Sequence, residues 1–412
     1  MPDLTGYYAV QTETAKRLAE PAPGRVQILT GPRQVGKTTI LLGIAREWGD
    51  QAIYLAADAP EASLAGWWDA QWRRAVRLAR DGKAALLLDE AQYLPDWSRL
   101  VKSAADEILR ERLPLHIMIT GSASLQIGAG ARETMAGRFE RLVLRQWTAR
   151  DLAEAFGLAA DDAVDCFVRF GSFPGGMNLL SDPRRWRAYI RDSIIEPAIG
   201  RDLLMLEAIR KPALLRQVYA VCTGHPSEIL SLSKIAGAVT DRGTLETIAH
   251  YLHVLEEAYL ISAIRKYSAR ELRRRASPPK PVPLNNALLA AMLQVDPPTS
   301  LRDAESWGRW VENACLAFAI GNGQDVHYWR EEPLEIDGVI SGSWGKWAVE
   351  IKTGHCMTRD LSGLLEFCRR WPGYRPLLIC NDEQSDVARR VGIESVTWKQ
   401  FLWDGLAEDA RF

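Results

Sequence analysis

The chain has 412 residues and a formal net charge of −1, with 47% hydrophobic and 25% charged residues. This length predicts two to four globular domains, and the near-zero charge excludes a uniformly basic nucleic-acid-binding protein, so that any basic surface must be local. The six cysteines have no short paired spacing, which favours reduced thiols over a disulfide framework or a zinc site. Without a signal peptide or an apolar run long enough to cross a bilayer, we expect a cytoplasmic protein with no membrane partner.

A glycine-rich loop follows the first apolar segment. Val26–Leu29 predicts a buried strand and Ile40–Ala45 a helix, and between them stand Gly31, four further residues and Gly36-Lys37-Thr38. In this context backbone N–H groups and the helix N-terminus bind a polyphosphate, Lys37 contacts its β- and γ-phosphates, and the Thr38 hydroxyl binds Mg²⁺. The predicted nucleotide-binding residues are Gly31, Pro32, Arg33, Gln34, Val35, Gly36, Lys37, Thr38 and Thr39.

Two adjacent carboxylates end a later apolar segment. The run Ala84–Leu88 predicts a buried strand, and Asp89 and Glu90 follow it directly. This is the Walker B arrangement, in which Asp89 lies in the Mg²⁺ coordination shell and Glu90 orients and polarises the attacking water. The alternative is a surface Asp-Glu pair.

Two further polar positions follow in the chain. The predicted strand Leu115–Thr120 ends in hydroxyl groups, so that Thr120 or Ser122 can sense the γ-phosphate, and either can equally cap the following turn. Arg138 precedes the predicted strand Arg141–Leu144 and can reach the nucleotide of a neighbouring subunit, where it would stabilise transition-state charge. The alternative is an ordinary surface arginine or one paired with an acid.

The segments GPRQVGKTT, LLLDEAQ, ITGS and AGR, in this order and spacing, resemble the prokaryotic AAA+ ATPases of the archaeal-ATPase-like group. The resemblance implies ATP and Mg²⁺ as cofactors, a five-stranded parallel sheet of order 5-1-4-3-2, and a homo-oligomer in which Arg138 acts in trans. It also implies a helical lid, expected over 148–215 after an ATPase core over 1–147, and a C-terminal nuclease-like domain. Arg33 and Gln92 belong to the group's pattern without an assigned chemical role.

The middle of the chain predicts a winged-helix module over 216–284. Ser231–Val239 and Leu245–Ala258 predict two helices about a tight turn, and Tyr259–Ile264 predicts the first strand of a wing. The second helix presents Glu246, which does not favour major-groove reading. It also presents His250 and His253, which either bind a metal ion or are two surface histidines.

Basic residues gather in the predicted wing, where they suit contacts with the phosphates of DNA. The alternative is a solvated loop or one that docks on an acidic partner. Lys280 belongs to the same basic run, and the proline-rich stretch 278–283 predicts a stiff linker. The predicted nucleic-acid-binding residues are Arg265, Lys266, Arg270, Arg273, Arg274 and Arg275.

A second group of charged residues lies near the C-terminus. Two predicted strands joined by a glycine turn bring Asp337, Glu350 and Lys352 to one edge, where the carboxylates can hold Mg²⁺ and the lysine can activate a water; Glu312 on the preceding helix could complete the metal shell. The pattern resembles the PD-(D/E)xK nucleases of restriction-endonuclease-like fold over residues 305–412. Ile336 stands where that family has proline.

These predictions define an α/β protein with a P-loop AAA+ parallel sheet, a helical lid, a winged-helix module and a restriction-endonuclease-like domain over 285–412. The predicted function is an ATP-hydrolysing protein that binds DNA and carries a metal-dependent nuclease-like domain. The alternative is a nucleotide-driven switch or scaffold whose nuclease-like domain is catalytically dormant and binds a protein partner.

Overall fold

The computed structural model of the chain describes residues 9–20, 25–121, 137–203, 209–241, 243–268, 277–299 and 303–406. Their contacts divide into two compact units. The first unit contains Met1–Gln146 and Gly200–Ile209, and the second contains Trp147–Ile199 and Arg210–Phe412.

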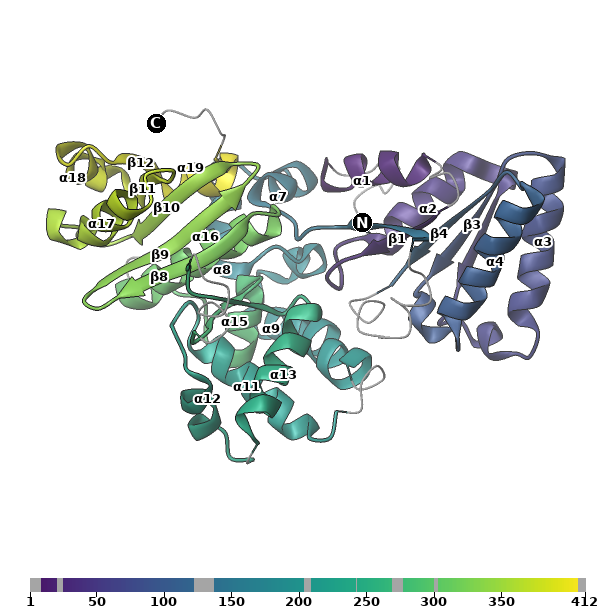
Figure 1. The fold of residues 1–412 in the computed structure, drawn as a ribbon, viewed down its shortest axis with the longest axis horizontal. Coiled ribbons are helices and arrows are strands. Elements are labelled where there is room, and N and C mark those ends of the chain that lie inside the picture. Colours follow the sequence, from purple (N-terminus) through teal and green to yellow (C-terminus); the bar gives the residue numbers. More distant parts are fainter. Residues whose placement is uncertain are drawn as a thin grey trace. The chain divides into compact units, whose positions relative to one another are not determined.

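The first unit is built on a parallel sheet. Among the described residues this sheet has five strands in the order β2-β3-β4-β1-β5, and every neighbouring pair is parallel (Figure 1). The predicted order 5-1-4-3-2 is confirmed. The elements of the unit are α1 (Ala9–Ala19), β1 (Val26–Thr30), α2 (Lys37–Trp48), β2 (Ala52–Ala56), α3 (Trp67–Asp81), β3 (Ala84–Asp89), α4 (Trp97–Glu111), β4 (Leu115–Thr120) and β5 (Phe139–Val143).

The central strands of this sheet form the core of the unit. All residues of β1, β3 and β4 are buried, as expected for parallel strands that are covered on both faces. Leu86, Leu87 and Leu88 are 0% exposed, and each contributes about 1.5–3 kcal/mol of hydrophobic stabilisation. Because parallel strands end at the same edge, the loop after β1 and the acids after β3 lie on one side of the sheet.

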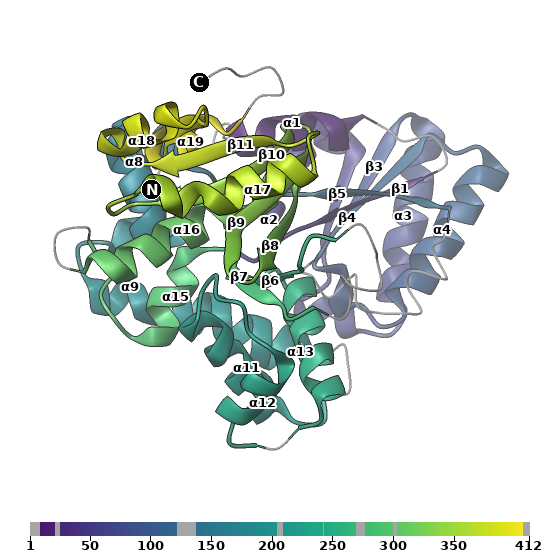
Figure 2. The same ribbon diagram turned by 60° about the vertical axis from the view of Figure 1, so that its left-hand side comes forward.

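The second unit combines helices with two further sheets. Among the described residues the larger sheet has the order β12-β11-β10-β9-β8, in which β8, β9 and β10 pair antiparallel while β10, β11 and β12 pair parallel. Helix α17 lies across β9, β10 and β11 (Figure 2). The sheets are formed by β6 (Ile261–Ile264), β7 (Lys280–Pro283), β8 (Asp325–Glu331), β9 (Leu334–Gly342), β10 (Gly345–Lys352), β11 (Arg375–Cys380) and β12 (Glu394–Thr397). The α-helices are α7 (Ala149–Phe156), α8 (Ala160–Phe170), α9 (Pro183–Ile190), α11 (Pro212–Gly224), α12 (Leu232–Ala238), α13 (Leu245–Glu257), α15 (Asn286–Leu293), α16 (Ala304–Gly321), α17 (Ser362–Arg370), α18 (Ser385–Arg390) and α19 (Trp398–Asp404).

A buried polar network joins three segments of this unit. The Asn286 amide donates to the carbonyl oxygens of Val168 (2.7 Å) in α8 and Trp310 (2.9 Å) in α16. The Asn313 amide donates to the Pro283 carbonyl and to the Asn286 side chain, both at 2.8 Å. Because buried polar groups are costly when unpaired, this network fixes how the segments pack.

The predicted linker at 278–283 is wrong over its last four residues, which form β7 and pair antiparallel with β6. Lys280 and Val282 retain N–H groups that face β6, whereas the alternating prolines have none. On the other edge, the carbonyl oxygens of Pro279 and Pro281 accept hydrogen bonds from the backbone N–H groups of Leu230 (2.8 Å) and Ser227 (2.9 Å). Alternation therefore lets a proline-rich segment pair as a strand.

Helices α12 and α13, with β6 beyond them, lie in the segments where the sequence predicts two helices and a strand. Ser231 and Thr244 cap the two helices through their side chains, each accepting from a backbone N–H three residues later. The winged-helix assignment of this module stays a prediction.

No helix in the described part of the chain is sufficiently long and apolar to span a lipid bilayer.

Candidate functional site

The loop between β1 and α2 has the geometry of a phosphate cradle. Gly31 and Gly36 have φ angles of 147° and 102°, which L-residues with a side chain rarely adopt. Helix α2 begins directly after Gly36, which offers no side chain to cap the first turn. The Lys37 ammonium donates to the carbonyl oxygens of Gly31 (3.0 Å) and Pro32 (2.6 Å), so that it lies within the loop.

Close contacts also leave no room for a side chain at either glycine. A Cβ atom at Gly31 would lie 2.4 Å from the carbonyl oxygen of Leu144, and one at Gly36 would lie 2.1 Å from Nε2 of Gln11 in α1. The loop is therefore packed between the chain after β5 and the first helix. This packing fixes the loop backbone, and the residues of the loop fit a polyphosphate ligand.

Asp89 at the end of β3 is held by three donors. It accepts hydrogen bonds from the Tyr54 hydroxyl (2.8 Å), from the Thr120 hydroxyl and from the Glu90 backbone N–H (3.1 Å). Burial raises the pKa of Tyr54, and the hydrogen bond to Asp89 raises it further, so that this hydroxyl stays a donor. Sequence reasoning missed Tyr54; its only signal is a hydroxyl in the strand that neighbours β3.

Glu90 follows in a left-handed backbone conformation, with φ of 51°. Its carboxylate accepts a hydrogen bond from the Gln92 amide, which gives this pattern residue a structural role. Burial raises the pKa of Glu90, whereas the Gln92 hydrogen bond and the nearby Lys37 charge oppose that rise. A carboxyl group with a raised pKa suits proton transfer near neutral pH.

Thr120 and Ser122 are the two hydroxyl residues predicted as γ-phosphate sensors. Thr120 is 0% exposed and contacts Asp89 and the backbone N–H of Glu90 (3.3 Å). Ser122 lies outside the described residues.

Arg138 is paired within its own subunit. Its Nε lies 2.7 Å from Oδ1 of Asp106 in α4, and both side chains are partly exposed. An exposed ion pair of this kind is weak, so that it does not prevent Arg138 from exchanging partners. Its role in trans stays a prediction.

The acids of the second unit come together as an acid cluster, which we define as Glu312, Asp337 and Glu350 with Lys352. Val349 pairs with Gly338, so that Asp337 and Glu350 are the next residues of the two strands. The Lys352 ammonium lies 2.7 Å from Oε1 of Glu350, and Asp337 Oδ2 accepts a hydrogen bond from the Ile351 N–H (2.8 Å).

A residue that sequence reasoning left outside this group lies inside it. The Lys280 ammonium is 2.7 Å from Oε1 of Glu312 and 3.8 Å from Oδ1 of Asp337, and it donates to the Asp337 carbonyl oxygen (3.2 Å). The side chain is 1% exposed. The signal for it in the sequence is the alternation of Lys280 with prolines, a pattern that also predicts a linker.

The acid cluster does not fit a metal ion as it stands. Among the described residues no group of three or more His, Cys, Asp or Glu side chains is placed to hold one. The Lys280 ammonium already compensates Glu312 and Asp337. Burial raises the pKa values of Glu312 and Glu350, although the neighbouring lysines oppose the rise.

The basic residues predicted to bind nucleic acid are partly described. Arg265 and Lys266 are half-buried beside β8, where the Arg265 carbonyl oxygen accepts from the Tyr328 N–H (3.2 Å). Arg270 and Arg273–Arg275 lie outside the described residues.

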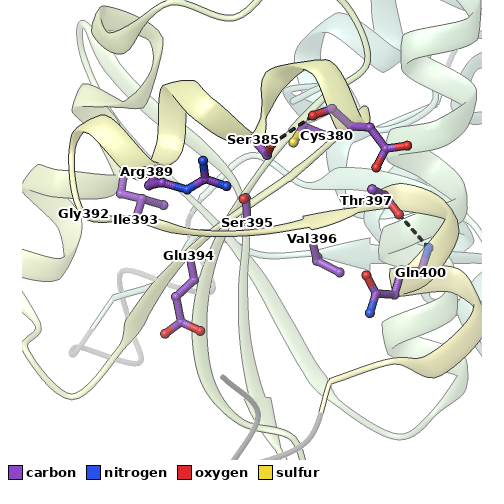
Figure 3. A pocket seen from close by; sticks show the side chains of 11 residues that line it. Cys380, Ser385, Arg389, Gly392, Ile393, Glu394, Ser395, Val396, Thr397 and Gln400 are labelled. Carbon is purple, nitrogen blue, oxygen red and sulfur yellow. Dashed lines mark hydrogen bonds between the residues drawn. The ribbon is translucent and has the colours of Figure 1, made fainter. Parts of the chain in front are cut away.

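A pocket of about 400 Å³ lies on the second unit, beside β12 and α18 (Figure 3). Arg389, Ser385 and Gln400 contribute polar groups, and Glu394 contributes a carboxylate. None of the residues of the acid cluster lines it, so that the two features are separate.

Comparisons with known proteins locate two families on the chain. Residues 23–153 match the model of an AAA domain, and residues 162–299 match a domain of unknown function. The chain is 28% identical to the uncharacterized protein Rv2008c of Mycobacterium tuberculosis over 335 residues, which are 79% of this chain and 70% of that protein. The same figures hold for the uncharacterized protein Mb2031c of Mycobacterium bovis.

Solved structures with partial similarity include the Aeropyrum pernix ORC1 protein in complex with DNA, with 15% identity, a TM-score of 0.32, and coverage of 71% of this chain and 95% of that one. AMPPCP-bound DnaA from Aquifex aeolicus has 16% identity, a TM-score of 0.32, and coverage of 60% and 86%. RuvB of Thermotoga maritima has 17% identity, a TM-score of 0.31, and coverage of 62% and 86%.

The AAA family match covers the whole parallel sheet with its phosphate loop and terminal acids. The first unit therefore contains a nucleotide-binding domain of the AAA ATPase type.

Proposed function

We propose that this protein hydrolyses ATP and binds DNA, and that ATP turnover takes place at the loop after β1. The observation that carries the proposal is the position of Lys37 in a two-glycine loop on the same sheet edge as Asp89 and Glu90. These groups bind phosphate, complete the shell of a cation and accept a proton, which are the tasks that hydrolysis requires.

The residues that would hold the cofactors follow from their chemistry. The loop from Gly31 to Thr39 would bind the phosphates through its N–H groups and Lys37. The Thr38 hydroxyl and the Asp89 carboxylate would bind Mg²⁺, which prefers oxygen ligands. Bound Mg²⁺ supplies charge neutralisation, while Glu90 orients a water and draws its proton away.

Two variants test this site. We expect Lys37→Ala to lose ATP binding, and Glu90→Gln to bind ATP with unchanged affinity while releasing phosphate at least a hundredfold more slowly, since the catalytic carboxylate contributes to turnover and not to phosphate binding. Fluorescent-nucleotide titration measures the first effect and a phosphate-release assay the second. Undiminished turnover in folded Glu90→Gln protein would remove Glu90 from the mechanism.

We further propose that Arg138 acts on the nucleotide of a neighbouring subunit, which makes the active form a homo-oligomer. Arg138→Ala would then lower turnover, and a mixture of Arg138→Ala and Glu90→Gln subunits would regain part of it because each supplies what the other lacks. Absence of any regain, with mixed oligomers present, would restrict Arg138 to its pair with Asp106.

DNA binding is supported by the basic segment around Arg265 and Lys266, which continues through Arg270 and Arg273–Arg275 in the sequence. Phosphate contacts release counterions, so that affinity should fall steeply as salt rises. Neutralising Arg273–Arg275 should weaken binding of linear, branched and single-stranded DNA alike and flatten the salt dependence, as measured by fluorescence anisotropy. Unchanged affinity would reject this segment as the DNA contact.

A second candidate function is a nucleotide-driven switch whose nuclease-like domain is dormant. The Lys280 ammonium, which compensates Glu312 and Asp337, favours it over metal-dependent cleavage. Incubation of the wild-type protein with DNA and Mg²⁺ or Mn²⁺, with and without ATP, separates the two. Cleavage that is lost in Lys352→Ala protein with intact ATPase activity would establish the nuclease instead.

A further inference from the structure

Lys280 reaches the acid cluster from outside the sheet that carries Asp337 and Glu350. Lys280 begins β7, where it pairs with Ile264 of β6. The carbonyl oxygen of Pro278, two residues earlier, accepts a hydrogen bond from the Tyr328 hydroxyl of β8 (2.7 Å). Three residues beyond the end of β6, the Tyr267 N–H donates to the Tyr328 carbonyl oxygen (2.6 Å). Tyr328 therefore holds both flanks of the β6–β7 pair against the sheet.

The burial of Lys280 requires a compensating charge. An ammonium that is 1% exposed is strongly disfavoured unless opposite charges and acceptors surround it. Glu312 Oε1, Asp337 Oδ1 and the Asp337 carbonyl oxygen supply them at 2.7, 3.8 and 3.2 Å. The ammonium thus has three oxygen neighbours from two elements, which is the environment that a bound cation would have.

The charges in the cluster leave little room for an additional dication. Three carboxylates and two ammonium groups would carry a net charge of −1 when all are ionised. A divalent ion would reverse this balance and lie close to Lys280. One carboxylate oxygen nevertheless has no hydrogen-bond partner among the described residues, namely Oε2 of Glu350, although Glu350 is only 6% exposed. The cluster therefore retains an unused ligand atom.

We propose that Lys280 is the resident cation of the acid cluster, and that its ammonium takes the position in which a divalent metal ion would otherwise bind. Wild-type protein then takes up no Mn²⁺ at the cluster, and loss of the ammonium converts the cluster into a metal site formed by Glu312, Asp337 and Glu350. This inference rests on the second candidate function, in which the nuclease-like domain is dormant, and it supplies the cause of that dormancy.

The test is a Mn²⁺ titration of the full chain without nucleotide, followed by calorimetry and by electron paramagnetic resonance of free Mn²⁺. The variants are Lys280→Met, which keeps an unbranched side chain one atom shorter and removes its charge, and Lys280→Arg, which keeps the charge. Each protein is also compared with its Asp337→Asn counterpart, so that only binding lost with Asp337 is assigned to the cluster.

We expect Lys280→Met to gain one Asp337-dependent Mn²⁺ site, at least tenfold tighter than any such site in the wild type or in Lys280→Arg. Mn²⁺ should also raise its melting temperature by several degrees and leave that of the wild type unchanged. An Asp337-dependent site of equal affinity in the wild type would overturn the inference, as would a folded Lys280→Met protein without one.

If Lys280→Met does not fold, the wild-type titration decides alone: an Asp337-dependent site contradicts the inference and its absence supports it. The Mn²⁺ titration and the assays of the proposed function can fail independently of each other. Missing ATP turnover leaves the Mn²⁺ result untouched, and cleavage of DNA by wild-type protein that binds no Mn²⁺ at the cluster would reject dormancy while Lys280 remained the resident cation.

Discussion

At the scale of single residues, Gln92 controls the charge of the carboxylate that we expect to activate water. Its amide donates to Glu90, and this hydrogen bond lowers a pKa that burial raises. Hydrogen bonds to charged groups contribute about 1.5–3 kcal/mol, more than those between neutral groups. Gln92 therefore helps to keep Glu90 ionised.

Gln92→Leu should accordingly raise the pKa of Glu90 and move the acidic limb of the kcat–pH profile to higher pH. The KM for ATP should stay unchanged, because Gln92 contacts the carboxylate and not the phosphate loop. Steady-state ATPase measurements from pH 5 to 9 check this, with the exposed Gln51→Leu as control. An unshifted profile with a normal kcat would contradict the role of Gln92.

We predict that His116 lowers the free energy of unfolding in acid. It lies in β4, 5% exposed, and neither ring nitrogen has a hydrogen-bond partner among the described residues. Burial lowers its pKa to about 4 from an ordinary value of 6.5. Between these values the unfolded chain binds a proton that the folded chain does not, so that the free energy of unfolding falls as pH falls from 6.5 to 4.

The expected loss from this residue is on the order of 3 kcal/mol over that interval and does not increase further below pH 4. Urea unfolding at several pH values measures it, with His116→Leu as the comparison because leucine cannot titrate. Equal pH slopes in the two proteins would show that His116 does not carry the effect.

Single residues also define what the sequence could and could not predict at the sites. Lys37, Asp89 and Glu90 were predicted from local context, since a loop between a strand and a helix, and acids after an apolar run, carry their meaning within a few positions. Tyr54 and Lys280 were not, because each reaches its partner across a separate element: Tyr54 from a neighbouring strand, and Lys280 from 57 positions before Asp337. Such contacts depend on tertiary packing.

At the scale of elements, too, some features could be predicted from the sequence and others could not. The buried strands β1, β3 and β4 follow from their apolar runs, and their order was predicted from the family resemblance rather than from any residue pattern. Strand β7 was missed because prolines predict an extended linker when their spacing is ignored. Its spacing matters, because Lys280 and Val282 supply the only N–H groups that β7 directs toward β6.

Because of this spacing, substitutions at neighbouring positions of β7 should differ in their effect on stability. Val282→Pro removes an N–H group of the pair with Ser262 and should lower the free energy of unfolding by at least about 1–3 kcal/mol. Pro281→Ala, one residue earlier, adds an N–H group on the other edge and should change stability by less than about 1 kcal/mol. Urea denaturation of both variants gives the comparison, and equal losses would show that the register of β7 is not what holds it.

At the scale of the whole molecule, the asparagine network links segments of the second unit, and we expect that unit to fold as one body. Asn313 is 0% exposed, and its partners include Ser227 (3.3 Å), Pro283 and Asn286, which come from segments that the sequence assigns to different domains. The sequence predicts separate domains over 148–215, 216–284 and 285–412. We expect these ranges to unfold together, except for Gly200–Ile209, which belongs to the first unit.

Asn313→Ala leaves several buried polar groups unpaired and should lower the unfolding free energy of that unit by about 2–5 kcal/mol. Asn322→Ala is the matched control, since the Asn322 amide, at the C-cap of α16, donates to the carbonyl oxygen of Phe318 in the same helix, and it should cost less than about 1 kcal/mol. Calorimetry checks both. Separate transitions for the three ranges would contradict a common unit.

The prolines of β7 have a consequence for association between molecules. An exposed strand edge normally offers donors and acceptors to any extended peptide, and such edges lead to aggregation. The outer edge of β7 presents carbonyl oxygens without matching donors, and Ser227 and Leu230 already bind two of them. A foreign strand therefore cannot pair with this edge of β7 through its backbone N–H and C=O groups.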